Sequence, residues 1–184
     1  MKRIRRDLEV FARWLGGDVV AAEAQIVACD DGLMRFFRRK ASPQDCDDLK
    51  QAVWQRLLER PPETLQNGPR AYVFGIARHV LYRYYEQRSG EKWDRLTTSI
   101  LDLDPRLAAQ AAHDVGDWMP CTVLQQLAID DQLLLEMRYD HDLSLAELAE
   151  ANEVPLGTIK SRLHHACRKL RTLLQGKGVM HVGV

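Results

Sequence analysis

The final segment of the chain holds basic side chains whose types and spacing suit the binding of a polyanion. Residues 155–184 carry six lysine or arginine residues and no acidic residue, a net charge of +6. From Pro155 to Leu174 apolar residues recur at helical spacing, and the basic residues occupy the other side of that helix. Arginine can pair bidentately with guanine, whereas lysine and serine more often hold phosphate. This pattern indicates contact with a nucleic acid.

A second group combines aromatic rings with guanidinium groups. Residues 70–95 carry six basic and three acidic residues, a net charge of +3. Aromatic faces and arginine planes are the groups on which unstacked bases of a single strand rest. Four side chains in this segment are candidates for that chemistry: Tyr72, Arg78, Tyr82 and Arg83. For Phe74 and Tyr84 packing is the better interpretation, because both lie beside the apolar stripe of the same helix.

Residue patterns that would indicate catalysis or a bound metal are missing from the sequence. It contains no P-loop, no HExxH and no GxSxG motif, and its four cysteines form no CxxC pair. His164 and Cys167 would share a helix face, but two ligands do not make a zinc site and a packing role is the better interpretation. Adjacent carboxylates on a helix point about 100° apart, so Asp47 and Asp48 make a poor acid–base pair. We therefore expect no catalytic residue, no metal and no cofactor.

The formal net charge of zero is a cancellation between segments. Residues 96–154 carry twelve acidic and two basic residues, a net charge of −10, which offsets the two basic segments. Neutrality therefore excludes only a uniformly basic protein.

The longest uncharged stretch, Trp118–Ile129, is shorter than the roughly 18 residues of a membrane span, so no membrane insertion is expected. The cysteines are interpreted as reduced thiols of a cytoplasmic protein.

The elements that must position these groups are helices, because apolar residues recur at helical spacing nearly throughout. Helices are expected over about 8–15, 18–40, 42–60, 70–88 and 106–112, and in a second helical unit from about Trp118 to Leu174. Ser42-Pro43 is typical of a helix start, with serine as the cap and proline in the first turn. The expected buried positions are Leu33, Phe36, Phe37, Leu49, Val53, Trp54, Leu57, Leu58, Val73, Ala77, Val80, Leu81, Tyr84, Ile159, Leu163, Ala166 or Cys167, Leu170 and Leu174.

The second unit contains the strongest local signal, a helix-turn-helix. Ser144 and Glu147 have the spacing of a capping box, in which each side chain satisfies a backbone N–H of the first turn. The short helix that follows leads through a turn at 152–154 to Pro155 and the longer basic helix. In such motifs the second helix enters the major groove of DNA. Either Glu153 or Asn152 must absorb the turn, and a left-handed glutamate would cost roughly 1 kcal/mol relative to glycine.

Three stretches resemble the extracytoplasmic-function group of bacterial RNA polymerase sigma factors. The promoter-binding region 4 of that family is similar to LSLAELAEANEVPLGTIKSRLHHACRKLRTLL. The start of its region 2 is similar to LMRFFRRKASPQDCDDLKQAVWQRLLERP, and its promoter-melting helix to PRAYVFGIARHVLYRYYEQR. The resemblance covers roughly Ile26–Arg95 and Trp118–Leu174, in the order of the family.

The resemblance implies an all-α protein of two small helical domains joined by a flexible acidic linker. The N-terminal domain would span 1–95, with the match starting at about 26, the linker 96–117, and the C-terminal helix-turn-helix domain 118–184. The implied function is to direct RNA polymerase to promoters by recognising the minus-35 and minus-10 elements and starting strand opening. The implied partners are core RNA polymerase and promoter DNA, and such factors are commonly held by an anti-sigma protein.

Roles carry over residue by residue from the matched motifs. The minus-35 contacts correspond to Thr158, Lys160, Ser161, Arg162 and His165. The minus-10 contacts correspond to Asn67, Arg70, Tyr72, Arg78, His79, Tyr82 and Arg83, where His79 stands at a position at which the family often has asparagine. The stretch that grips the polymerase clamp corresponds to Asp47, Asp48, Leu49 and Gln51.

Two other classes remain open from the residues. One is a helix-turn-helix transcriptional regulator with an N-terminal dimerisation domain, and the other is a helical adaptor that binds only protein. The N-terminal half discriminates between them and a sigma factor, since only a sigma factor needs both clamp-binding acids and a melting helix.

Overall fold

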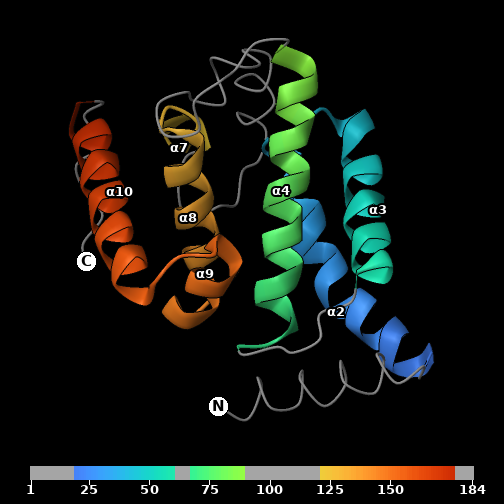
Figure 1. Ribbon diagram of the computed structural model, residues 1–184. Coiled ribbons are helices and arrows are strands. Elements are labelled where there is room, and N and C mark those ends of the chain that lie inside the picture. Colours follow the sequence, from blue (N-terminus) through green and yellow to red (C-terminus); the bar gives the residue numbers. More distant parts are fainter. Residues whose placement is uncertain (1–18, 61–66, 90–120, 177–184) are drawn as a thin grey trace.

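The computed structural model describes residues 19–60, 67–89 and 121–176, and helices are the regular elements of these ranges (Figure 1). The first group comprises α2 (Val19–Arg38), α3 (Pro43–Glu59) and α4 (Pro69–Ser89). The second comprises α7 (Cys121–Leu124), α8 (Ile129–Tyr139), α9 (Leu145–Asn152) and α10 (Leu156–Gly176). The predicted all-α class is confirmed. The helices expected at 8–15 and 106–112 lie outside the described residues.

The start of α3 follows from its sequence, but its cap differs in detail from the expectation. Ser42 is the N-cap residue with extended backbone, and Pro43 stands in the first turn, where no N–H is needed. The Ser42 hydroxyl accepts no backbone hydrogen bond and instead donates to Asp45 at 2.6 Å. The carboxylate of Asp45 is thereby held at the positive end of the helix.

Most of the predicted apolar positions are buried; Trp54, Tyr84, Leu163 and Leu174 are only partly buried, and one prediction is wrong. Among the expected core positions with described side chains, most of those in α2, α3 and α4 are at most 8% exposed. The prediction that Leu58 is buried is wrong, because its side chain is 63% exposed, while its neighbour Leu57 is fully buried. Successive residues on a helix point about 100° apart, so only one of two adjacent leucines can face a narrow core.

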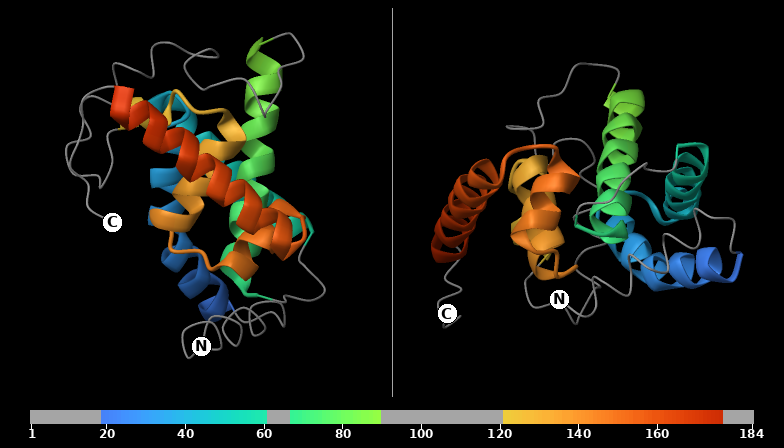
Figure 2. Two further views of the ribbon diagram at one scale, coloured as in Figure 1. Left: turned by 90° about the vertical axis from the view of Figure 1, so that its left-hand side faces the viewer. Right: turned by 60° about the horizontal axis from the view of Figure 1, so that its bottom comes forward.

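One hydrophobic core runs through both groups of helices. Phe36, Phe74 and Leu81 from the first group share it with Leu133 and Leu148 from the second. In Figures 1 and 2, α8 and α9 stand between α4 and α10, and α2 and α3 flank α4 on its other side. A smaller cluster joins α7, α8 and α10. The described parts of the two predicted domains are therefore packed together, and the division into domains stays a prediction.

The two groups of helices approach each other closely at Gly75 in α4. A Cβ atom built there would lie 3.3 Å from the backbone oxygen of Ala151 and 3.5 Å from its Cα. That is tighter than nine in ten real contacts of a Cβ atom, so the absent side chain lets α9 rest directly on α4. Among the described residues, no helix is both long and apolar enough to cross a membrane.

Candidate nucleic-acid interface

The helix-turn-helix is formed by α9, a tight turn and α10. The capping box is present in full: Glu147 N–H donates to Ser144 Oγ at 3.2 Å, and Ser144 N–H donates to the Glu147 carboxylate at 2.7 Å. Glu153 takes the left-handed turn conformation, with φ 56° and ψ 39°. The turn is closed by a hydrogen bond that the Val154 N–H donates to the Ala149 carbonyl oxygen, at 3.1 Å. Of the two alternatives for this turn, Glu153 rather than Asn152 absorbs it.

The buried side of α10 consists of Ile159, Ala166 and Leu170, which pack on α8 and α9. Of the two alternatives at 166 and 167, Ala166 is fully buried and Cys167 only partly so. The predicted minus-35 residues lie on the outer side, and all but the half-exposed Thr158 are exposed: Lys160, Ser161, Arg162 and His165. Figure 2 shows α10 at the outer edge of the molecule, away from α2, α3 and α4. A duplex could therefore reach this face without rearrangement of the described helices.

The predicted minus-10 residues lie on and just before α4, and they differ in accessibility. His79 and Arg83 are exposed, and Asn67, Arg70 and Tyr72 are half-buried. Arg78 is only 6% exposed and Tyr82 only 4%, and the Arg78 guanidinium lies over the Tyr82 ring at 5.5 Å from its centroid. An aromatic ring and an arginine can each stack on a single-stranded base, but in this conformation both groups are buried.

The second group of helices covers the face of α4 that carries the predicted minus-10 residues. Asn67 donates through its backbone N–H and its side-chain amide to the Glu150 carboxylate, both at 2.9 Å. His79 Nε2 lies 3.2 Å from Glu153, and the Tyr82 hydroxyl donates to Asp130. Two further contacts involve neutral acceptors: Arg78 donates to the Asn152 side-chain oxygen and Arg70 to the His141 carbonyl. These partners were not predicted, because only the acidic character of 96–154 could be seen in the sequence.

An ion pair deep in the structure joins the end of α2 to α8. Lys40 is fully buried and pairs with Glu136, which is 1% exposed. Its ammonium group also donates to the Phe36 carbonyl at 2.6 Å and lies 4.2 Å from the Phe36 ring centroid. Burial lowers the pKa of Lys40, and the Glu136 carboxylate opposes that change. Beside this pair, Arg39 bonds to Asp140.

The predicted polymerase-binding residues lie on α3, and three of the four point outward. Asp47, Asp48 and Gln51 are exposed, whereas Leu49 is buried in the core. Lys50 lies beside them and pairs with Asp30 at 2.9 Å. The outward set is a compact polar surface on one helix, and the leucine contributes packing beneath it.

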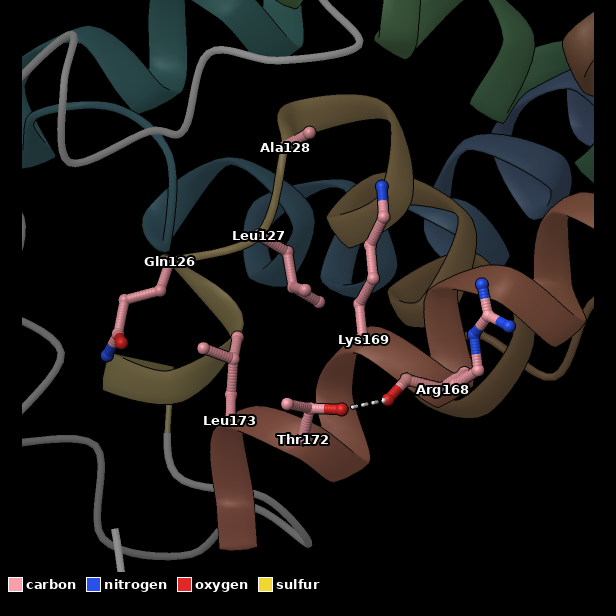
Figure 3. A pocket seen from close by; sticks show the side chains of 7 residues that line it. All are labelled: Gln126, Leu127, Ala128, Arg168, Lys169, Thr172 and Leu173. Carbon is pink, nitrogen blue, oxygen red and sulfur yellow. Dashed lines mark hydrogen bonds between the residues drawn. The ribbon is translucent and has the colours of Figure 1, made fainter. Parts of the chain in front are cut away.

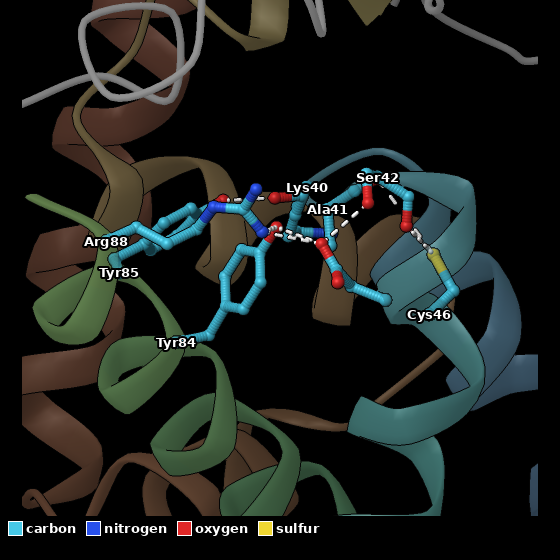
Figure 4. Close-up of polar contacts among 8 residues, drawn as sticks. Lys40, Ala41, Ser42, Cys46, Tyr84, Tyr85 and Arg88 are labelled. Carbon is cyan, nitrogen blue, oxygen red and sulfur yellow. Dashed lines mark hydrogen bonds and ion pairs between the residues drawn. The ribbon is translucent and has the colours of Figure 1, made fainter.

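Asp45 has a structural role at the start of α3. It accepts hydrogen bonds from Ser42, from the Tyr84 hydroxyl at 2.9 Å and from Arg88 at 2.6 Å. The Ser42 hydrogen bond is the main cause that lowers the pKa of the Asp45 carboxyl, while burial followed by the Asp45 bond raises the pKa of Tyr84 to about 12. Figure 4 shows Tyr84, Tyr85 and Arg88 reaching from α4 toward the segment between α2 and α3.

A pocket of about 560 Å³ lies between the turn before α8 and the C-terminal half of α10 (Figure 3). Its walls combine apolar and basic side chains: Gln126, Leu127, Ala128, Arg168, Lys169, Thr172 and Leu173. Lys169 is engaged by Asp131 at 2.5 Å. The pocket lies apart from the predicted minus-35 residues, which occupy the other half of α10.

Within the three described ranges, no group of three or more histidine, cysteine or acidic side chains could hold a metal ion. His164 is exposed and Cys167 is half-buried, with the Cys167 sulfur 3.8 Å from the Tyr139 hydroxyl. Cys29 and Cys46 are buried.

Comparison with known proteins shows which proteins the chain resembles. The family model for sigma-70, region 4 matches residues 123–172, which contain the helix-turn-helix. The RNA polymerase sigma-E factor of Streptomyces coelicolor is 28% identical over 156 residues, covering 84% of this chain and 86% of that protein. The probable RNA polymerase sigma-C factor of Mycobacterium bovis is 27% identical over 152 residues, covering 82% and 81%. A protein named the ECF RNA polymerase sigma factor SigC of Mycobacterium tuberculosis matches to the same extent.

Among solved structures, the chain is similar to one described as the sigma factor RpoE in complex with the anti-sigma factor NepR from Bartonella quintana. The TM-score is 0.60 at 17% identity, covering 85% of this chain and 98% of that one, so the fold is shared. The chain thus carries a match to sigma-70, region 4 and is similar over more than four-fifths of its length to proteins named RNA polymerase sigma factors. These similarities agree with the resemblance of its sequence to the extracytoplasmic-function group, and they support a function in directing RNA polymerase to promoters. The regulator alternative is not favoured.

Proposed function

We propose that the two groups of helices divide promoter recognition between them. The outer face of α10 binds the minus-35 duplex through Arg162 and its neighbours, and α4 receives bases of the minus-10 strand. The observation that carries the proposal is the exposure of the polar and basic set at the N-terminal half of α10, opposite its buried stripe. In the predicted domain division, 1–95 serves the downstream element and 118–184 the upstream one.

The N-terminal residues of a recognition helix meet base edges, and those residues are Thr158, Lys160, Ser161 and Arg162 here. Arg162 is the best candidate for a bidentate contact with guanine, and Lys160 for a phosphate. Such a bidentate contact accounts for roughly 1–3 kcal/mol of discrimination between bases. Arg162→Ala is therefore expected to weaken minus-35 recognition about tenfold or more.

Docking to the polymerase is assigned to the outward carboxylates of α3. Asp47 and Asp48 are exposed and lie next to exposed Gln51, so a basic surface of the polymerase could contact all three. Asp48→Lys reverses one of these charges without touching the core. We expect it to weaken association with core polymerase and to leave the helical content unchanged.

The factor does no chemistry of its own in this proposal: the polymerase catalyses, and the chain recognises DNA in the cytoplasm, where the polymerase works. Sigma factors are in general not catalytic. Because the sigma factor of the structural neighbour is held by an anti-sigma factor, we include such a protein among the partners of this chain.

The test is transcription in vitro with purified chain and core polymerase on a library of promoter fragments. The chain should select a distinct set of start sites that core alone does not use. Arg162→Ala should lose that selection, and Arg171→Ala, an exposed arginine farther along α10, should keep it. Asp48→Lys should lose core binding in a pull-down, and Glu59→Lys at the far end of α3 should not. Absence of both core binding and selected starts in the unmodified chain would refute the proposal.

A further inference from the structure

Two adjacent histidines lie on the outward side of α10, among the residues assigned to the minus-35 element. His164 and His165 are both exposed. The buried stripe of this helix consists of Ile159, Ala166 and Leu170, and at about 100° per residue both histidines fall more than about 100° from its centre. Sequence reasoning included His165 in the minus-35 set but assigned His164 to packing. The structure therefore brings a second imidazole to the face assigned to DNA.

The two imidazole rings contact each other, and one of them is hydrogen-bonded to an arginine. The ring centroids of His164 and His165 are 5.8 Å apart, with an angle of 73° between the planes. Nη2 of Arg168 lies 3.3 Å from Nδ1 of His165. A guanidinium can only donate, so Nδ1 is the acceptor and carries no proton in this arrangement. His165 is therefore neutral here, although a cation lies beside it.

The charged residues near the two histidines on their own helix are all basic. Residues three or four positions apart are neighbours on a helix surface. Those at such spacing from one or both histidines are Lys160, Arg162, Arg168 and Lys169. Because α10 contains no acidic residue, an anion that meets these rings must come from outside the helix.

The acids of the elements packed against α10 have other partners. α7 carries no charged residue. The acids of α8, of α9 and of the turn before α10 form these contacts: Asp130 with Tyr82, Asp131 with Lys169, Glu136 with Lys40, Glu147 with Ser144, Glu150 with Asn67 and Glu153 with His79. The other ionisable groups of α8 contact a carbonyl and a sulfur: Arg138 with Leu143 and Tyr139 with Cys167. Within the described ranges, neither His164 nor His165 has an acidic partner.

Histidine brings to such a surface a charge that depends on pH. Lysine and arginine stay protonated between pH 5 and pH 8, whereas an imidazole gains or loses its charge there. A protonated imidazole offers two N–H donors to phosphate oxygens, and a neutral one offers a single donor. Each added cation that neutralises a phosphate also releases a counterion from the DNA. A duplex therefore binds the protonated form more tightly, and by linkage its binding takes up protons.

From this arrangement we propose that His164 and His165 contact the phosphate backbone of duplex DNA and make its binding to α10 tighter as the pH falls. In the bound state Arg168 turns from His165 to a phosphate, and the imidazole takes up a proton and donates to the backbone as well. The inference deepens the proposed function and rests on it in one respect, the assignment of the outer face of α10 to duplex DNA.

Three variants of the full-length chain separate charge from shape. The double variant His164→Gln, His165→Gln keeps polar side chains of similar size and removes the titrating charge. The double variant His164→Arg, His165→Arg gives both positions a charge that does not titrate. His113→Gln makes the same substitution at a histidine outside α10 and is the matched control. Helical circular dichroism at pH 7.5 and at pH 6.0 establishes that each variant is folded under both conditions.

The experiment measures the affinity for a rhodamine-labelled, mixed-sequence duplex of 25 base pairs by fluorescence anisotropy, at pH 7.5 and at pH 6.0 in the same low salt. Uptake of one proton on binding raises the affinity by up to about tenfold per pH unit. The unmodified chain and His113→Gln should therefore bind about tenfold tighter at pH 6.0. The affinity of the double glutamine variant should change by about twofold or less. The double arginine variant should bind at pH 7.5 at least as tightly as the unmodified chain binds at pH 6.0.

Four results would overturn the proposal. The first is an unmodified chain with equal affinity at both pH values, and the second is a chain that binds the duplex at neither. The third is a double glutamine variant that keeps the full response to pH. The fourth is a double arginine variant that binds no more tightly at pH 7.5 than the unmodified chain does. Failure to select transcription starts with core polymerase would refute the proposed function instead, and it would leave the measured response of duplex binding to pH as it stands.

Discussion

His141 should make the stability of this protein depend on pH in a window where exposed carboxylates do not titrate. The residue precedes the capping box, is 4% exposed, and lies with its ring centroid 4.5 Å from that of Phe74. Burial, reinforced by the positive charges of Lys40 and nearby arginines, lowers the pKa of His141 to about 2. The folded state therefore keeps this imidazole neutral while the unfolded chain protonates it near pH 6.5.

The sign and size of the effect follow from proton linkage. Between the folded and unfolded pKa values the unfolded chain binds more protons, so the free energy of unfolding falls as pH drops below about 6.5. At pH 5 the chain is about 1.5 units below that value, and about 1.4 kcal/mol per unit gives a loss of about 2 kcal/mol. The lowered pKa of Asp45 acts in a separate window, because its contribution is lost only below about pH 4.

The assay is urea unfolding at pH 7.5 and at pH 5 for the unmodified chain and for His141→Phe, a ring that suits the neighbouring phenylalanines. Between pH 7.5 and pH 5 the free energy of unfolding of the variant should fall by about 2 kcal/mol less than that of the unmodified chain, whatever the absolute stability of the variant. His141→Gln, which is polar but does not titrate, should show the same reduced loss and thereby separate charge from packing. Equal losses in all three proteins would refute the claim that the fold keeps His141 neutral.

Three further predictions concern stability and use urea or thermal unfolding. Leu57→Ala should cost about 2–5 kcal/mol because it empties a fully buried site, and Leu58→Ala next to it should change stability by less than about 0.5 kcal/mol; equal costs would contradict the assigned face of α3. Ser144→Ala should cost about 1 kcal/mol by removing half of the capping box, whereas an unchanged free energy of unfolding would show the cap to be dispensable. Glu153→Gly should increase the free energy of unfolding by roughly 0.5–1 kcal/mol and raise the melting temperature, because the backbone of Glu153 is left-handed and glycine adopts that conformation without strain. A lower melting temperature would mean that the exposed pair of Glu153 with His79 contributes more than the strain costs.

Local signals made much of this fold predictable. Ser42-Pro43 predicted the start of α3, and the Ser144 and Glu147 spacing predicted the start of α9, because caps and proline act within one turn of chain. The exposure of the predicted minus-35 residues was predictable for the same reason, because they lie outside the apolar stripe of a single helix.

Features that depend on contacts between distant segments could not be predicted. Nothing local distinguishes Leu57 from Leu58 as the buried leucine, and the packing of α2 and α4 on α3 decides it. The burial of Arg78 and Tyr82 results from α8 and α9, which are more than forty residues away in the chain. The segment charges showed that acids and bases balance, but only the structure shows which acid meets which base.

The core that both groups of helices share has a consequence for temperature. Phe74 and Ile159 are buried in one cluster, so separating the groups would expose apolar surface to water. Exposure of apolar surface raises the heat capacity, and hydrophobic attraction weakens on cooling. The balance between the packed arrangement and a separated one should therefore shift toward separation in the cold, which would make this factor sensitive to temperature without any dedicated sensor.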